Sequence, residues 1–137
     1  MCIRDSIKPG DFGIEVTETA ELNNLSTASL RLSSIKNLGV SIALDDFGAG
    51  YSALRYLKDL PVDVLKLDKS FTFELEETHN QSLVQIAKLM ADSLSMEFIC
   101  EGLEEEWQVK RAISLGCEMG QGYYLHKPCS LEDLNNE

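Results

Sequence analysis

The stretch from Ser41 to Tyr51 most constrains how this chain can fold. It opens with a short apolar run of strand character and ends in two adjacent carboxylates, Asp45 and Asp46, which lead into a glycine-rich loop. In parallel α/β folds, the carboxyl end of a strand is where functional sites are built. Because neighbouring like charges repel, burying both carboxylates is expensive unless a cation compensates. Two interpretations stay open at this point: a divalent-metal site beneath a glycine loop, or a polar turn after a buried strand.

The rest of the chain alternates between two hydrophobic periodicities. Short apolar or alternating runs predict strands, and they cover residues 12–18, 41–45, 64–68, 96–100 and 119–125. Helical periodicity predicts helices over residues 21–37, 52–57, 80–95 and 104–115, with a short one starting at Ser130. In the 80–95 helix, the stripe expected to face the core is Leu83, Ala87, Met90 and Leu94, supported by Ile86. This β-α alternation predicts the α/β class, with a parallel sheet and helices between its strands.

Composition narrows the class of protein. The 137 residues correspond to about one domain, and the net charge of −11 argues against a nucleic-acid polymer as partner. No apolar run approaches the ~18 residues of a membrane span, so we expect no direct membrane contact from this segment. The four cysteines form no Cys-x-x-Cys pair, which argues against a zinc site and favours reduced thiols in the cytoplasm. Those cysteines are Cys2, Cys100, Cys117 and Cys129.

Polar residues recur where the predicted strands end. Taken singly, each is weak evidence, since a carboxylate on an edge strand or in a turn is normally just solvated. A parallel sheet brings the carboxyl ends of its strands to one rim, so we expect these side chains to converge. The set is Glu15, Asp45, Asp46, Lys66, Asp68, Glu101 and Gln121. Oxygen ligands without a competing Cys–His set favour Mg²⁺ or Mn²⁺.

This combination suits hydrolysis of a phosphodiester by two metal ions. Two hard cations lower the pKa of a bound water and stabilise the charge on the attacked phosphate. Lys66 would hold or orient the water, or neutralise phosphate charge. Glu101 would bind the second metal or act as a base.

Five motifs in this order resemble the signatures of the EAL domain family. They are Glu15-Val16-Thr17-Glu18, Asp45 to Ser52, Leu60 to Phe71, Glu101-Gly102-Leu103-Glu104, and Gln121-Gly122-Tyr123 followed by Pro128. The resemblance covers about residues 7–130. We therefore expect residues 7–137 to be the C-terminal part of an EAL domain and residues 1–6 to be a leader of unclear origin.

The resemblance implies a TIM-like (β/α)₈ barrel that hydrolyses cyclic di-GMP to linear pGpG with Mg²⁺ or Mn²⁺. By position, it implies Glu15, Asp45 and Asp46 as metal ligands. It also implies Lys66 and Glu101 as catalytic residues. Cyclic di-GMP, a homodimer through the domain, and a parent protein fused to sensory or cyclase domains are the partners it implies. Such a parent is cytoplasmic or anchored to the membrane.

Three further roles follow from the same resemblance. Gln121 and Asp68 match substrate-binding positions. Glu18 matches the residue that anchors the glycine loop at 47–52.

One departure from the family pattern bears on activity. No Glu-Ala-Leu triplet occurs in the 137 residues, and the family's asparagine ligand from an early strand has no match. Because both would precede Glu15, we expect a partial barrel with about five of the eight strands. Three hypotheses follow: part of a phosphodiesterase, a non-catalytic module that senses cyclic di-GMP, or a fragment that is inactive by itself.

Overall fold

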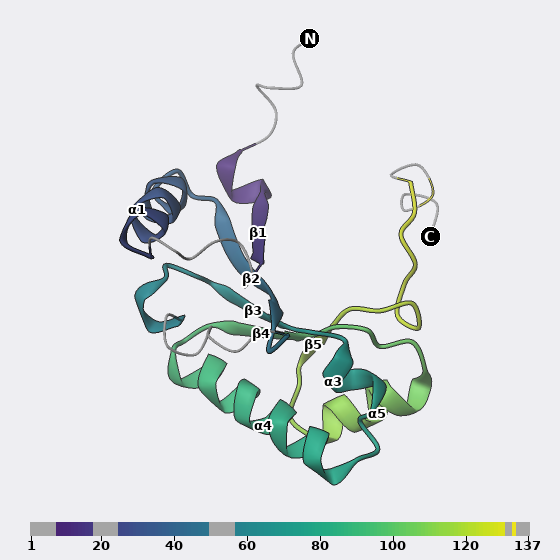
Figure 1. The fold of residues 1–137 in the computed structure, drawn as a ribbon. Helices are drawn as coiled ribbons and strands as arrows, with labels where there is room; N and C mark the ends of the chain where they lie inside the picture. Colours follow the sequence, from purple (N-terminus) through teal and green to yellow (C-terminus); the bar gives the residue numbers. More distant parts are fainter. Residues whose placement is uncertain (1–7, 18–24, 50–56, 131–132, 134–137) are drawn as a thin grey trace.

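A computed structural model describes residues 8–17, 25–49, 57–130 and 133. Its centre is a five-stranded parallel sheet in which each strand pairs with the next one along the chain, in the order β1-β2-β3-β4-β5 (Figure 1). The strands are β1 (Gly13–Thr17), β2 (Ser41–Phe47), β3 (Val64–Leu67), β4 (Glu97–Cys100) and β5 (Met119–Gly120). The predicted α/β class and parallel sheet are confirmed.

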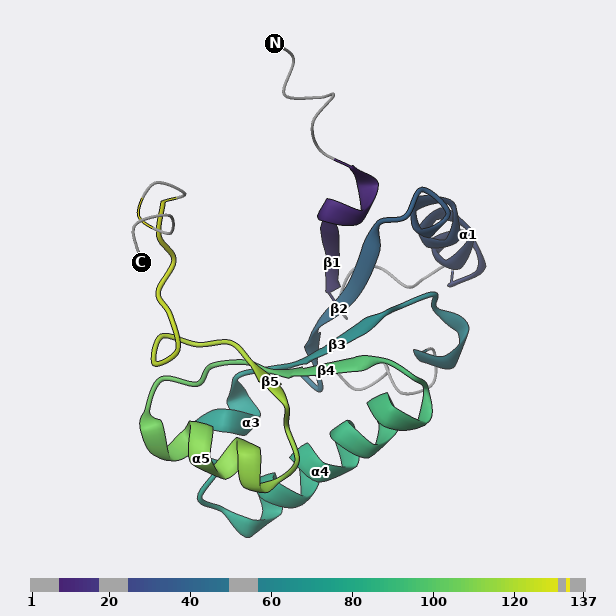
Figure 2. The same ribbon diagram turned by 180° about the vertical axis from the view of Figure 1, so that it is seen from behind.

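Helices cover one side of this curved sheet. They are α1 (Leu25–Lys36), α3 (Ser70–Phe73), α4 (Thr78–Ser93) and α5 (Glu106–Ser114), with 3-10 turns η2 (Pro9–Asp11) and η4 (Leu57–Asp59). In both views, α4 and α5 lie beneath β4 and β5, and α1 lies beside β2 (Figures 1 and 2). Within the described ranges, no helix is both long and apolar enough to cross a membrane.

The core lies between the sheet and these helices. Alternate strand residues contribute its fully buried side chains, as the two-residue period of a strand requires. The sheet supplies Ile42, Leu44, Leu65, Leu67, Phe98 and Cys100. The intervening positions, among them Ala43, Lys66 and Ile99, line the opposite face of the sheet.

The stripe predicted on α4 is confirmed in part, since Ala87 is buried and Met90 packs against the core. The positions of this helix that are buried among apolar neighbours are Val84, Ala87 and Ala91. Leu94 is exposed, and so is Ile86 on the same helix. Small side chains allow a helix to approach a sheet closely, and Ala87 and Ala91 lie at this contact together with Val84. On α5, Trp107 and Val109 pack against the core, whereas Ile113 is 65% exposed.

Element boundaries differ most near the chain ends. The strand expected over 119–125 ends at Gly120, because the chain then turns and the His126 N–H donates to the Gly122 carbonyl (3.1 Å). A short helix, α3, occupies residues expected to form a loop. Ser130 and Asp133 exchange hydrogen bonds of the kind expected at a helix start. Glu18 and most of the helix predicted over 52–57 lie outside the described residues.

A β-bulge at the end of β2 positions the site. The pairing of β2 with β3 runs from Leu44 opposite Leu65 to Phe47 opposite Leu67, so β2 carries one extra residue there. Asp46 adopts a positive φ of 55°, a conformation that Asp tolerates better than most residues. In a regular strand, Asp46 would face the core like Leu44. The bulge instead returns Phe47 to the core and places both carboxylates at the rim.

Candidate functional site

Lys66 stands at the centre of a cluster of carboxylates on the open face of the sheet. Its Nζ lies 2.7 Å from Glu15 Oε1 and 2.7 Å from Glu101 Oε1. Asp45 Oδ1 is 3.0 Å away. The three carboxylates come from β1, β2 and the exit of β4, so parallel pairing alone brings them to Lys66 on β3. The convergence expected from the strand ends is present in the structure.

Burial and charge act in opposite directions on this lysine. The Lys66 side chain is only 5% exposed, and burial by itself would favour the neutral amine. The interactions with Glu101, Glu15 and Asp45 outweigh burial and hold the pKa of Lys66 above its ordinary value. Lys66 is therefore a permanent cation at neutral pH, which suits it to neutralise charge and rules it out as a base.

One lysine leaves this cluster short of positive charge. Three carboxylates contact Lys66. Asp45 Oδ1 is buried and, despite its charge contact with Lys66, has no hydrogen-bond partner among the described residues. Oxygen atoms of Asp45, Asp46 and Glu101 lie within 4.8 Å of one another, close enough to hold one metal ion. A buried oxygen that makes a charge contact but no hydrogen bond, next to two further carboxylates, fits a hard divalent cation.

The pKa values of two of these carboxylates also indicate a shortage of positive charge at this rim. Burial raises the pKa of Asp46, and the neighbouring charges of Asp45 and Asp68 raise it further, with Lys66 acting in the opposite sense. Burial also raises the pKa of Glu101, beyond what its ion pair with Lys66 can reverse. A cation bound between these residues would relieve both effects.

The remaining predicted residues surround the cluster. Gln121 borders two hollows, one shared with Glu15 and Lys66, and the other shared with Glu101. Asp68 accepts hydrogen bonds from the backbone N–H (2.9 Å) and the hydroxyl of Ser70, so it also fixes the start of α3. Glu18, the expected loop anchor, lies outside the described residues.

The start of the glycine loop is tightly packed. Gly48 has a φ of +95°, and a Cβ added there would lie 2.6 Å from the ring of Phe71. Phe71 itself packs against the core. Only glycine combines this conformation with this contact, so the chain just after Asp45 and Asp46 is held in one place.

A buried polar network behind Glu101 was not predicted. Gln108 Oε1 accepts the backbone N–H groups of Glu104 (2.7 Å) and Glu105 (2.8 Å), and its Nε2 donates to the Thr72 carbonyl (3.0 Å). The Thr72 hydroxyl lies 2.5 Å from the Glu101 carbonyl. These contacts fix the backbone that carries Glu101. The one sequence signal was Glu105-x-x-Gln108, a capping-box spacing at the start of α5.

The family comparison agrees with this geometry. The model of the EAL domain family matches residues 2–128. The chain belongs to the EAL domain family, whose solved structures share its fold, and the partial TIM-like barrel predicted from the sequence is confirmed.

Characterised relatives carry the activity that the resemblance implied. The chain is 35% identical over 96% of its length to the bifunctional diguanylate cyclase/cyclic di-GMP phosphodiesterase MucR of Pseudomonas aeruginosa. It is also 35% identical over 92% of its length to the cyclic di-GMP phosphodiesterase PdeA of Borreliella burgdorferi. The chain spans only 19% of each relative.

Solved structures that hold bound ligands share the fold of this chain. The phosphodiesterase of MucR, in complex with c-di-GMP, superposes with a TM-score of 0.88 at 35% identity, over 96% of this chain and 53% of that one. A manganese/cy-diGMP complex of BlrP1 from Klebsiella pneumoniae superposes with a TM-score of 0.86 at 28% identity. That superposition covers 92% of this chain and 32% of BlrP1.

Proposed function

We propose that this chain, within a complete EAL domain, hydrolyses cyclic di-GMP to linear pGpG with the help of divalent metal ions. The observation that carries the proposal is Lys66, one buried cation that faces three carboxylates on the open side of the sheet. An excess of partly buried negative charge at this rim suits a site that takes up metal and then a phosphodiester. Relatives named as cyclic di-GMP phosphodiesterases support the choice of substrate.

Asp45, Asp46 and Glu101 would hold the first metal ion. Glu15 is linked to this group by Lys66, which forms ion pairs with Glu15, Asp45 and Glu101. When bound, Mg²⁺ or Mn²⁺ would lower the pKa of a water molecule and stabilise negative charge on the attacked phosphate. The manganese complex of BlrP1 favours Mn²⁺ as the first ion to test.

The protein groups divide the remaining work by their charge. Lys66 stays protonated, orients Glu15, Asp45 and Glu101, and offsets charge on the phosphate. Burial raises the pKa of Glu101 and makes it a stronger base than an ordinary glutamate, which suits it to accept a proton from water. We assign Gln121 and Asp68 to the substrate and Glu18 to the anchoring of the glycine loop.

A chimera tests the proposal directly. Residues 7–130 would replace the segment of the MucR phosphodiesterase with which they align, and pGpG formation would be followed by chromatography with Mn²⁺ or Mg²⁺. We expect metal-dependent hydrolysis, and a loss of about 100-fold or more in Glu101→Gln and Lys66→Met chimeras. Glu97→Gln, at the other end of β4, serves as the matched control and should retain activity.

The isolated chain is expected to behave differently from the chimera. Without the family's Glu-Ala-Leu glutamate, the 137-residue chain should form pGpG far more slowly than the chimera. Rapid, metal-dependent hydrolysis by the purified chain would contradict this.

The likeness to solved structures that hold c-di-GMP also supports a second candidate, a module that binds cyclic di-GMP without cleaving it. A folded chimera that binds cyclic di-GMP in calorimetry but forms no pGpG would select this function. A folded chimera that does neither would contradict both candidates. A homodimer through the domain, fusion to sensory or cyclase modules, and a cytoplasmic location complete the proposal.

A further inference from the structure

Two buried cysteines face each other next to the site. Cys100 is the last residue of β4, and Cys117 lies in the short connection between α5 and β5. The Cys100 and Cys117 Sγ atoms are 3.2 Å apart, both thiols are free, and both side chains are buried.

The backbone around each cysteine keeps the two sulfurs together. The Cys100 carbonyl accepts the N–H of Gln121 (2.8 Å), because β5 pairs with β4 at this point. The Cys117 N–H donates to the Ala112 carbonyl at the end of α5 (3.0 Å). The contact is therefore made between two segments that are each fixed by the fold.

The separation of the sulfurs is close to what a bond requires. A disulfide has an S–S distance of about 2.05 Å, so the two sulfurs need to approach by about 1.2 Å. Rotation of two cysteine side chains and a small shift of the connection around the exposed Gly116 would supply this movement. The Cys100 backbone, fixed in the sheet, would stay in place.

We propose that Cys100 and Cys117 form an oxidation site, at which a hydroperoxide produces a reversible intramolecular disulfide. The peroxide would transfer one oxygen to Cys117, giving a sulfenic acid and releasing water or an alcohol. The Cys100 sulfur would then attack the Cys117 sulfur, so that the S–S bond forms, the S–O bond breaks and a second water leaves with the Cys100 proton. Two thiols are oxidised by two electrons, and one peroxide is reduced.

The bond would tie the two strands on either side of α5 together. It closes a loop between positions 100 and 117, which restricts the unfolded chain and should stabilise the folded one. It would also fix the end of β4 one residue before Glu101. The proposal does not depend on the catalytic function proposed above.

The experiment uses the full chain with Cys2→Ser and Cys129→Ser, which leaves only the proposed pair. Cys129 is exposed, so its replacement should be neutral, and circular dichroism checks that this background folds. The reduced protein is treated with hydrogen peroxide under native conditions. We expect a mass loss of about 2 Da, a peptide cross-linked between Cys100 and Cys117, reversal by dithiothreitol, and a higher urea midpoint for the oxidised form.

Two controls make the result decisive. A Cys117→Ser variant of the same background should show no mass loss and no change in its urea midpoint on oxidation. The unaltered chain, mapped by peptide mass spectrometry, should show the same cross-link without any substitution. The proposal would be overturned by a gain of about 32 Da, which marks sulfinic acid, or by a cross-link that forms only in denaturant.

Discussion

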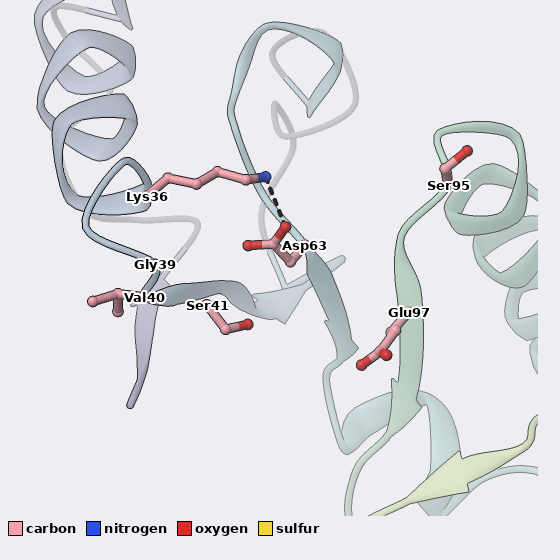
Figure 3. Close-up of a pocket in the computed structure, with 7 residues that line it drawn as sticks. All are labelled: Lys36, Gly39, Val40, Ser41, Asp63, Ser95 and Glu97. Atoms are coloured by element: carbon pink, nitrogen blue, oxygen red, sulfur yellow. Dashed lines mark ion pairs between the residues drawn. The ribbon is translucent and has the colours of Figure 1, made fainter. Parts of the chain in front are cut away.

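The sheet holds a lysine beside carboxylates at each of its two ends, and the two groups differ in how their charges balance. At the amino ends of the strands, Lys36 from the end of α1 reaches Asp63, with Nζ 2.7 Å from Oδ1 (Figure 3). Asp63 Oδ2 also accepts the backbone N–H of Ile42 (3.0 Å), and both side chains of the pair are more than a third exposed. At the carboxyl ends, buried Lys66 faces three carboxylates.

The pKa values at the two ends move in opposite directions. Burial alone would raise the pKa of Asp63, but the hydrogen bonds from Lys36 and from the Ile42 backbone outweigh it and bring the pKa below its usual range. The pKa values of Asp46 and Glu101 are raised. At the amino ends, the charges of Lys36 and Asp63 balance each other and serve stability, whereas the carboxyl ends carry an excess of negative charge that a bound cation would balance.

The largest difference between the two ends of the sheet should be the stability that is lost when each lysine is removed. We expect Lys66→Met to lower the free energy of unfolding by about 3–5 kcal/mol, because it removes the cation shared by three carboxylates, of which Asp45 and Glu101 are largely shielded from solvent. Lys36→Met should cost about 1 kcal/mol or less, because its ion pair is substantially exposed. Urea denaturation of both variants at low salt measures the difference. Equal losses would show that the Lys66 cluster is no more than a solvated surface group.

The glycines that flank β2 provide the second comparison. Gly39 and Gly48 both have a φ above +85°, but only a Cβ at Gly48 would overlap a neighbour, the ring of Phe71. Gly48→Ala should cost about 2–4 kcal/mol, from backbone strain and overpacking together. Gly39→Ala should cost about 1 kcal/mol, from backbone strain alone. Thermal unfolding of the two variants would contradict this if their losses were the same.

Metal binding should be confined to the carboxyl end. Asp46→Asn and Glu101→Gln are expected to weaken Mn²⁺ binding about tenfold or more, because each removes a negative oxygen from the cluster. Asp63→Asn should leave the affinity unchanged. Titration of Mn²⁺ followed by electron paramagnetic resonance compares the three variants. Equal weakening in Asp63→Asn would place the bound ion elsewhere.

The two ends should also respond oppositely to pH. Because the pKa of Asp63 is lowered, its stabilising effect is present above the ordinary carboxyl range and is lost as pH falls through the lowered value. Asp63→Asn should therefore cost about 1 kcal/mol at neutral pH and little in acid.

The contribution of Asp46 to stability changes with pH in the opposite direction. Its raised pKa means that the folded state loses stability as pH rises through that value. Without metal, Asp46→Asn should thus stabilise the chain by about 0.5–1 kcal/mol at neutral pH and change little in acid. Urea midpoints of both variants across pH test the pair of signs. A loss of stability in metal-free Asp46→Asn at neutral pH would contradict the charge deficit.

Much of the site could be predicted because it depends on the order of strands. Glu15, Asp45, Lys66 and Glu101 follow apolar runs that alternate with helices, and a parallel sheet brings such positions to one rim. The motifs also identified the family, since they occur in the family's order.

Other features had no signal in the local sequence. The facing of α4 was predicted only in part. Ala87 and Met90 face the core as expected, but Val84 and Leu83 are equally apolar, and the packing of the helix on the sheet decides which of them is buried. Thr72, on a segment expected to be a loop, gave no indication that it would contact the Glu101 backbone. The contact between Cys100 and Cys117 required the pairing of β4 with β5.

The class of fold and the residue types that gather at the carboxyl rim follow from hydrophobic periodicity and from the order of the elements along the chain, and the family follows from its motifs. The distribution of charge at that rim depends on the three-dimensional arrangement. The bulge at Asp46 turned two consecutive carboxylates toward one place, and the burial of Lys66 made one cation serve three anions. Both depend on the pairing of neighbouring strands and on the exclusion of water, which residues distant in the sequence produce together.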